Sequence, residues 1–294
     1  MSPLAEIRII AFRELRRSVR SAKGIALSAL TLLGAFVASL ASVWVEGADR
    51  VRSNAASTQA YIELKRAIIE KATGDATLAA FLAPIPTSLL LFVKITVWFS
   101  PLLVALFGFD AISGELQHRE VRFWTVRSRR ASYFLAKLAG LWALVGLVTL
   151  ALNLLAGTVA LARGYVTVGE LFAWGLRFWL VTFAIAGAWC AIATFISSCV
   201  KTPILALLAT FGAFFVSWIC GAGGFIARQR ESIAGATGLP SQQMGWYEYL
   251  YPNAYDTLLM SSEPVRVWLA VGTLAGFVVV FAVAGTLLFQ RRDV

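Results

Sequence analysis

Long stretches of apolar residues alternate along the chain with shorter polar segments. Each stretch has a length near the roughly 20 residues that an α-helix needs to cross a membrane. The stretches cover approximately residues 24–45, 85–109, 133–162, 171–197, 203–222 and 265–289. They are continuously apolar and do not alternate residue by residue, which favours helices over the strands of a β-barrel. The pattern therefore predicts an all-α integral membrane protein with six transmembrane helices.

The first 23 residues follow a different pattern, with apolar positions at helical spacing and basic residues between them. The apolar positions are Leu4, Ile7, Ala11, Leu15, Val19 and Ala22. One interpretation is a basic amphipathic helix in the membrane interface, and the other is a simple basic flank that fixes orientation. Both interpretations place the N-terminus in the cytoplasm. The next apolar run is too long for the core of a signal peptide, about 7–15 residues, so we expect a retained transmembrane helix.

Composition and charge agree with a membrane protein. Hydrophobic residues make up 59% of the chain and charged residues 14%, whereas soluble domains carry about 25% charged residues. The formal net charge of +10 is explained by basic residues beside membrane helices, so nucleic acid is not an expected partner. The predicted cytoplasmic segments hold 14 lysines and arginines and the predicted outer segments hold 8. This bias, with an even number of crossings, predicts that both termini are cytoplasmic.

Two long polar segments are expected on the outer side. Residues 46–84 contain a helical pattern from Thr58 to about Leu82, which Pro84 and Pro86 would end. Residues 223–264 are rich in tyrosine and tryptophan, which prefer the membrane interface. This second segment is expected to lie on the outer leaflet or dip into it, with a plain exposed loop as the alternative. Either segment could meet an extracytoplasmic partner.

The chain lacks the motifs of an enzyme. Its single histidine, His118, cannot build a histidine-rich metal site, and the three cysteines have no metal-ligand spacing. There is no Gly-x-Ser-x-Gly motif and no Gly-x-x-x-x-Gly-Lys-Ser/Thr phosphate loop. We therefore predict no catalytic residue, metal or cofactor in this chain, and any ATP would be bound by another chain.

A few polar features fall inside the apolar runs. Lys94 lies about eight residues into its run, or about 12 Å at 1.5 Å per residue. Its side chain could snorkel to the interface or face a substrate or lipid. Arg177 lies closer to the end of its run, which favours snorkelling. Pro101 leaves a backbone carbonyl free, which neighbouring helices could satisfy; it could also serve packing alone.

The segment from residue 101 to residue 137 carries a motif. It reads Pro101-Leu-Leu-Val-Ala-Leu-Phe-Gly-Phe-Asp110-Ala-Ile-Ser-Gly-Glu115 and, further on, Arg130-Ala-Ser-Tyr133-Phe-Leu-Ala-Lys137. This resembles the type-2 ABC export permeases of the NosY-like and Nat-like branch. Those proteins typically show Asp-x-x-x-x-Glu at a helix end, then Ser-Arg-x-x-Tyr-x-x-Gly-Lys. There are three departures from this pattern. Arg119-Glu120-Val121-Arg122 stands where the family often has Gly-Thr, Arg127-Ser128-Arg129 where it often has Pro-Val-Ser, and Ala136 in place of the usual glycine.

The resemblance implies one permease domain over residues 1–294. Residues 1–23, including Phe12-Arg13-Glu14-Leu15, would form the family's cytoplasmic elbow helix, and residues 110–132 a coupling helix between the second and third membrane helices. The residues implied for coupling to an ATPase are Asp110, Glu115, His118, Arg119, Arg122, Arg127, Arg130 and Lys137. An alternative for Glu115 and Arg130, compatible with coupling, is an intramolecular salt bridge that fixes the turn. Lys94 and Pro101 are the candidates for a translocation or lipid-facing role.

The resemblance also implies partners. Two copies of an ABC ATP-binding subunit would carry ATP and magnesium, and a second permease copy, identical or related, would complete the membrane part. The assembly would be an exporter in the bacterial cytoplasmic (inner) membrane, in contact with membrane lipid. Two other functions stay open from the residues alone: a stand-alone secondary transporter or channel, and a membrane scaffold or assembly protein. The sequence does not indicate the substrate.

Overall fold

The computed structural model describes residues 2–52, 58–121, 123, 128–234 and 248–291, and every regular element within these ranges is a helix. Six of the described helices are long and apolar enough to cross a membrane. They are α2 (Ala22–Arg52), α5 (Thr87–Gly108), α8 (Arg130–Ala162), α9 (Val168–Cys199), α10 (Pro203–Ala234) and α12 (Pro264–Arg291). The all-α class and the six predicted membrane helices are thus confirmed. The main difference is that α10 continues well beyond the predicted end at residue 222.

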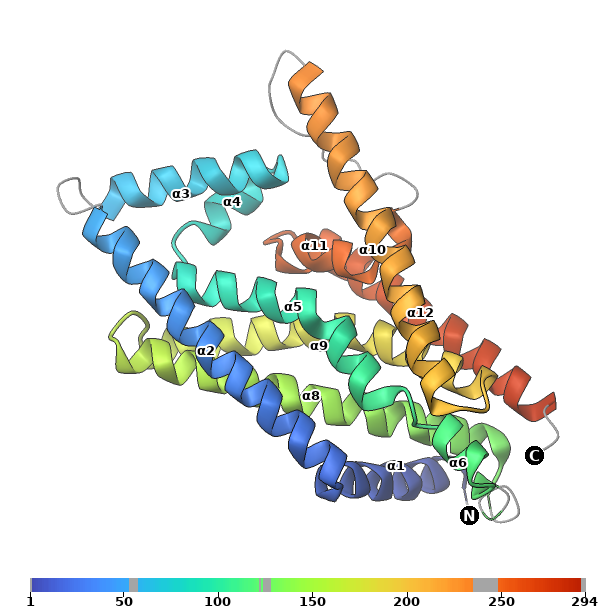
Figure 1. The fold of residues 1–294 in the computed structure, drawn as a ribbon. Coiled ribbons are helices and arrows are strands. Elements are labelled where there is room, and N and C mark those ends of the chain that lie inside the picture. The colour runs from blue at the N-terminus through green and yellow to red at the C-terminus, as the bar shows by residue number, and fades with distance from the viewer. Residues whose placement is uncertain (1, 53–57, 122, 124–127, 235–247, 292–294) are drawn as a thin grey trace.

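Helix α9 lies at the centre of the bundle, between α5, α8 and α12 (Figure 1). In its most apolar stretch, 72% of the residues are buried inside the protein, against 11% for α10. Both chain ends lie at the end of the bundle that holds the short helix α6 (Ser113–Gln117). We call this the terminal end. Helices α3 (Thr58–Thr73) and α4 (Ala76–Leu82) lie at the opposite end.

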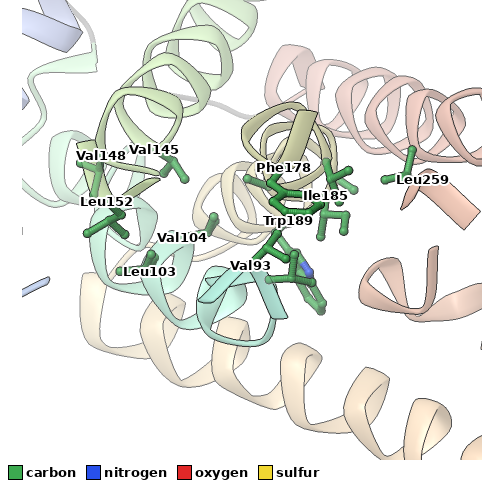
Figure 2. Packing of buried hydrophobic residues seen from close by; sticks show 14 of the residues in the cluster. Val93, Leu103, Val104, Val145, Val148, Leu152, Phe178, Ile185, Trp189 and Leu259 are labelled. Carbon is green, nitrogen blue, oxygen red and sulfur yellow. The ribbon is translucent and has the colours of Figure 1, made fainter. Parts of the chain in front are cut away.

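The interior is filled by aliphatic and aromatic side chains from the central helices. Figure 2 shows Val104 of α5, Val145 and Leu152 of α8, and Ile185 and Trp189 of α9 in one cluster. All of these side chains are buried within the chain. In lipid, burial of apolar groups drives helix association little, so close van der Waals packing of this kind supplies much of the attraction.

Helices α8 and α9 approach closely where glycines face aromatic rings. A Cβ atom on Gly187 would lie 2.6 Å from the Trp142 ring, and one on Gly146 would lie 2.6 Å from the Phe183 ring. The Trp142 and Phe183 rings stack with centroids 4.9 Å apart. The Trp142 indole N–H also donates to the Phe183 carbonyl at 2.9 Å. These glycines are therefore needed for packing, as small residues often are between membrane helices.

The segment after α2 was expected to form one helix from Thr58 to about Leu82, and it forms two. Gly74 has a left-handed φ of +71°, which ends α3. The Asp75 carboxylate then accepts hydrogen bonds from the backbone N–H groups of Thr77 and Leu78, at 2.9 and 3.0 Å, and caps α4. The end of α4 at Leu82 agrees with the expected boundary.

Helix α1 (Pro3–Arg20) forms where the sequence shows its amphipathic periodicity. Ser2 caps its first turn by accepting from the Ala5 N–H at 3.4 Å, and Pro3 occupies the first turn, where its missing N–H costs nothing. The extended backbone at Ser21 separates α1 from α2. Helix α1 packs across α8, where a Cβ on Gly140 would meet the Ala11 carbonyl at 3.3 Å.

The packing of Gly187 yields a testable prediction. Gly187→Val should lower the free energy of unfolding by about 2 kcal/mol, because adding methyl groups to a filled interior costs about 1–3 kcal/mol. The measurement is thermal or denaturant unfolding of the purified chain in detergent. Gly272→Val on α12 is the matched control, since a Cβ there meets no atom within 4 Å. Equal stability of the two variants would show that the contact with Trp142 is not tight.

Candidate functional site

The carboxylate of Glu115 lies in a buried group of charged and polar side chains at the terminal end of the bundle. It belongs to α6, and its side chain is only 8% exposed. It accepts from the Lys137 ammonium at 2.6 Å and from the Arg17 guanidinium at 3.0 Å. The Tyr133 hydroxyl donates to its second oxygen. Burying a carboxylate is costly unless it is paired and hydrogen-bonded, and this carboxylate is both.

Lys137 is the matching buried cation. Its side chain is 2% exposed, and its ammonium contacts Glu115 at 2.6 Å and Glu14 of α1 at 2.8 Å. One ammonium thus joins residues from α1, α6 and α8. We refer to Glu14, Arg17, Glu115, Tyr133 and Lys137 as the Glu115 cluster. The cluster fixes how α1 and α6 sit on α8.

Asp110 forms a second and more exposed ion pair beside this cluster. Its carboxylate accepts from the Lys23 ammonium at 2.6 Å, with the two side chains 37% and 33% exposed. The same ammonium lies 4.0 Å from the centroid of the Phe109 ring. A pair exposed to this degree is worth about 0–1 kcal/mol. Asp110 therefore helps to align α5 with the start of α2 but contributes less than the buried cluster.

The end of α9 is tied to the same region by Ser197. Its hydroxyl accepts from the backbone N–H groups of Ile112 and Ser113, at 3.1 and 3.0 Å. It donates to the Phe109 carbonyl at 2.9 Å. These N–H groups begin α6 and have no partner within the helix, so Ser197 satisfies them. Sequence reasoning did not find Ser197, because a lone serine in an apolar run carries no distinguishing signal.

The other described residues that were expected in the coupling segment lie outside the Glu115 cluster, apart from Lys137. His118 and Arg119 are exposed, and Arg119 has a left-handed φ of +58° at the end of α6. The Arg130 guanidinium donates to the Gln290 carbonyl of α12 at 2.8 Å. The ion pairs that fix the turn at Glu115 are made by Lys137 and Arg17. Arg122 and Arg127 lie outside the described residues.

A hollow of about 350 Å³ opens between α1, α6 and α8. Side chains of the Glu115 cluster line it together with Asp110 and His118. Among the described residues, no group of three or more His, Cys, Asp or Glu side chains could hold a metal ion. The hollow therefore places exposed and buried charges side by side at the terminal end.

Near the middle of the bundle, Pro101 interrupts the hydrogen bonding of α5. Proline has no N–H, so the Val97 carbonyl one turn earlier lacks its usual helical donor. The Ser100 hydroxyl donates to that carbonyl at 2.8 Å. The Asn253 amide, from the short helix η2 (Pro252–Tyr255), also donates to it at 2.8 Å. The Asn253 oxygen in turn accepts from the Trp189 indole at 2.8 Å. The segment of residues 248–260 thus folds back between the membrane helices at the depth of Pro101.

Lys94 has a partner in the same folded-back segment. Its ammonium donates to the Asp256 carboxylate at 2.6 Å, and the two side chains are 43% and 14% exposed. Asp256 begins α11 (Asp256–Met260), which follows η2, while η1 (Glu248–Leu250) precedes it. The positive charge inside the second apolar run is therefore paired within the chain. A role of Lys94 and Pro101 in translocation stays a prediction.

Comparison with protein families decides what kind of protein carries these features. The sequence matches the model of a family described as "ABC-2 family transporter protein" over residues 8–294. The chain belongs to this ABC-2 transporter family. A comparison with curated proteins gave no match.

Membership makes the chain the membrane-spanning permease subunit of an ABC transporter. An ABC-2 permease works with an ABC ATPase and is usually dimeric, so partners of both kinds follow from the family. The resemblance seen in the sequence at Asp110–Lys137 is thus confirmed at the level of the family. In this ABC-2 permease, the motif residues Glu115 and Lys137 are brought together in the buried cluster.

The burial of Glu115 predicts that its removal destabilises the permease more than removal of the more exposed Asp110. Glu115→Ala should lower the free energy of unfolding by about 3 kcal/mol or more, because it leaves the Lys137 ammonium with less compensation in a buried place. Asp110→Ala is the matched control and should cost about 1 kcal/mol or less. Unfolding of both variants in detergent is the measurement. Comparable losses would mean that the cluster is not shielded from solvent.

Asn253 supplies a separate prediction at the folded-back segment. Asn253→Ala should lower the free energy of unfolding by about 1–3 kcal/mol, because the buried Trp189 indole N–H loses its acceptor. The Val97 carbonyl keeps only the Ser100 hydroxyl as a donor. Asn153→Ala serves as control, since Asn153 donates only to the Thr149 carbonyl within its own helix. The same unfolding measurement applies. If Asn153→Ala loses as much free energy of unfolding as Asn253→Ala, the hydrogen bonds of Asn253 between helices do not carry the stability proposed for them.

Proposed function

We propose that this ABC-2 permease is the membrane part of an ATP-driven exporter in the bacterial cytoplasmic membrane. The terminal end, with α1, α6 and both chain ends, faces the cytoplasm. Two copies of a separate ATP-binding subunit carry ATP and magnesium and dock there. The observation that carries the proposal is the family match over residues 8–294 together with the charged segment around α6 at the terminal end.

The docking surface in this proposal is formed by exposed side chains after Glu115. They are His118, Arg119, Phe123 and Arg129, which we call the loop surface. Phe123 is a large apolar side chain that is 76% exposed within this polar segment. An aromatic side chain of this kind is a typical anchor in a protein interface, while surrounding charges guide orientation. Arg122 and Arg127 belong to the same stretch of sequence.

We propose that the Glu115 cluster transmits movement from the docked ATPase to the membrane helices. Glu115 lies in α6, next to the loop surface, but its carboxylate is held by Lys137 of α8 and Arg17 of α1. Breaking a buried pair costs about 3–5 kcal/mol. A push on α6 is therefore passed on to α1 and α8 as a unit. In this role Glu115 and Lys137 transmit the movement and do not touch the ATPase.

Membrane lipid and a second permease copy, identical or related, complete the proposed assembly. Helix α10 is the least buried of the membrane-spanning helices described here, and it presents large apolar side chains such as Ile204, Leu208 and Phe215. The Lys94–Asp256 pair and Pro101 lie where the folded-back segment meets α5. We propose that this meeting point belongs to the translocation path, because paired charges inside a membrane often mark such paths.

The loop surface gives the test of the proposed function. The tagged full chain is isolated from its native membranes, and the ATPase activity that co-purifies with it is measured. Phe123→Asp should reduce that activity about tenfold or more, because loss of an interface anchor typically costs about 2 kcal/mol or more.

Phe172→Asp is the matched control, because Phe172 is 72% exposed near the start of α9, at the opposite end of the bundle. The control should retain the co-purifying activity. If the native chain brings down no ATPase activity, or if Phe123→Asp retains all of it, the proposed docking is wrong.

A further inference from the structure

An apolar groove runs along the outside of α9 and α12, in the half of the bundle away from the terminal end. Its volume is about 600 Å³, within the range of small-molecule sites, about 300–1,000 Å³. Aliphatic side chains such as Leu180, Leu259 and Leu274 line most of it, and Trp142 closes one side. A groove of this lining on a membrane helix suits a hydrocarbon chain.

Arg177 is the one charged side chain among the described residues that line the groove. Its guanidinium donates to the Ser261 carbonyl at 2.6 Å and to the Met260 carbonyl at 3.3 Å. It also lies over the Phe81 ring, 4.7 Å from the centroid. The Trp174 ring lies on it as well, 5.9 Å from the centroid. These contacts hold the guanidinium at the groove, and none of them is with an anion. A guanidinium carries five donors, so further N–H groups can reach a ligand.

Several acidic groups of the chain are engaged elsewhere. Glu170, the nearest along the sequence, accepts from the backbone N–H and the hydroxyl of Thr167, both at 2.8 Å. The Asp75 carboxylate accepts from Arg266, and the Glu263 carboxylate pairs with Arg266 at 2.7 Å. Within the described part of the chain, Arg177 forms no ion pair of its own. A charge in a membrane segment is costly and calls for a partner. An anion from outside the chain could supply the counter-charge that the described residues do not.

The depth of Arg177 indicates what that partner is. Helix α9 has 32 residues, or about 48 Å at 1.5 Å per residue, so it extends about 9 Å beyond a hydrocarbon core of about 30 Å at each end. Arg177 follows Val168, the first residue of α9, by about 14 Å along the axis. Its Cα therefore lies about 5 Å inside the hydrocarbon boundary, and its long side chain reaches the phosphate level.

We propose that the groove is a binding site for an anionic phospholipid, with an acyl chain along α9 and α12 and the headgroup phosphate on Arg177. Arginine forms charge-assisted, often bidentate hydrogen bonds with phosphate. The apolar lining of the groove excludes water from the acyl chain of the lipid. This site is separate from the Glu115 cluster and from the loop surface, and lipid binding there needs neither ATP nor an ATPase.

Native mass spectrometry of the full chain in detergent tests the site. The chain is titrated with phosphatidylglycerol and, separately, with phosphatidylcholine. The wild-type chain should prefer phosphatidylglycerol, and Arg177→Gln should weaken phosphatidylglycerol binding about tenfold, as expected for the loss of a charge-assisted hydrogen bond. Arg177→Lys should retain part of the preference. Unchanged binding by Arg177→Gln would overturn the proposal.

A second variant tests the groove without touching the charge. Ala184 lines the groove, so Ala184→Phe should fill it and weaken binding of both lipids. Ala41→Phe is the control, because Ala41 is an exposed alanine of α2 outside the groove. Wild-type affinity in Ala184→Phe would overturn the groove as the site. Displacement of phosphatidylglycerol by millimolar inorganic phosphate would also overturn it, since it would mean a site for a free anion.

Discussion

The buried ion pair between Glu115 and Lys137 is the interaction on which the terminal end of this permease depends. Neither charge can be buried alone without a large cost in free energy. Each therefore requires the other, and the pair forms only when α6 and α8 are in register. Glu14, whose side chain is 20% exposed, extends the requirement to α1 by pairing with Lys137. Arg17 is 58% exposed, so its pair with Glu115 adds less. Buried pairs of this kind add little net stability compared with apolar contacts, so we regard the cluster as a device that selects one arrangement of three helices.

A second requirement acts in the middle of the bundle. Backbone groups in the hydrocarbon region must be satisfied within the protein, and irregular backbone is tolerated only where protein covers it. Pro101 leaves the Val97 carbonyl without its helical donor, and the folded-back segment brings Asn253 to that position. The same segment brings Asp256 to Lys94. Two positions of α5, the Val97 carbonyl beside Pro101 and the Lys94 ammonium, thus hold this polar segment between the membrane helices.

The membrane helices could be predicted because their length and apolar character are required by the bilayer itself. The break between α3 and α4 was missed although a signal was present, since a glycine followed by aspartate is a common helix end and helix start. The partners of charged residues could not be read from the chain. Lys94 and Asp256 are 162 positions apart, and Arg17 and Glu115 are 98 apart. The arginines of α1 were interpreted as a surface for lipid, because nothing local shows that Arg17 turns towards α6.

In the proposed mechanism, the Glu115 cluster holds α1, α6 and α8 together as one moving unit. The most direct test is the distance between spin labels on Arg16→Cys of α1 and Gln117→Cys of α6, two exposed positions, in the purified complex with and without ATP. We expect one narrow distance distribution in both states, and a broad distribution after Glu115→Ala. A narrow and unchanged distribution in Glu115→Ala, or a shift of the wild-type distance with ATP, would contradict it.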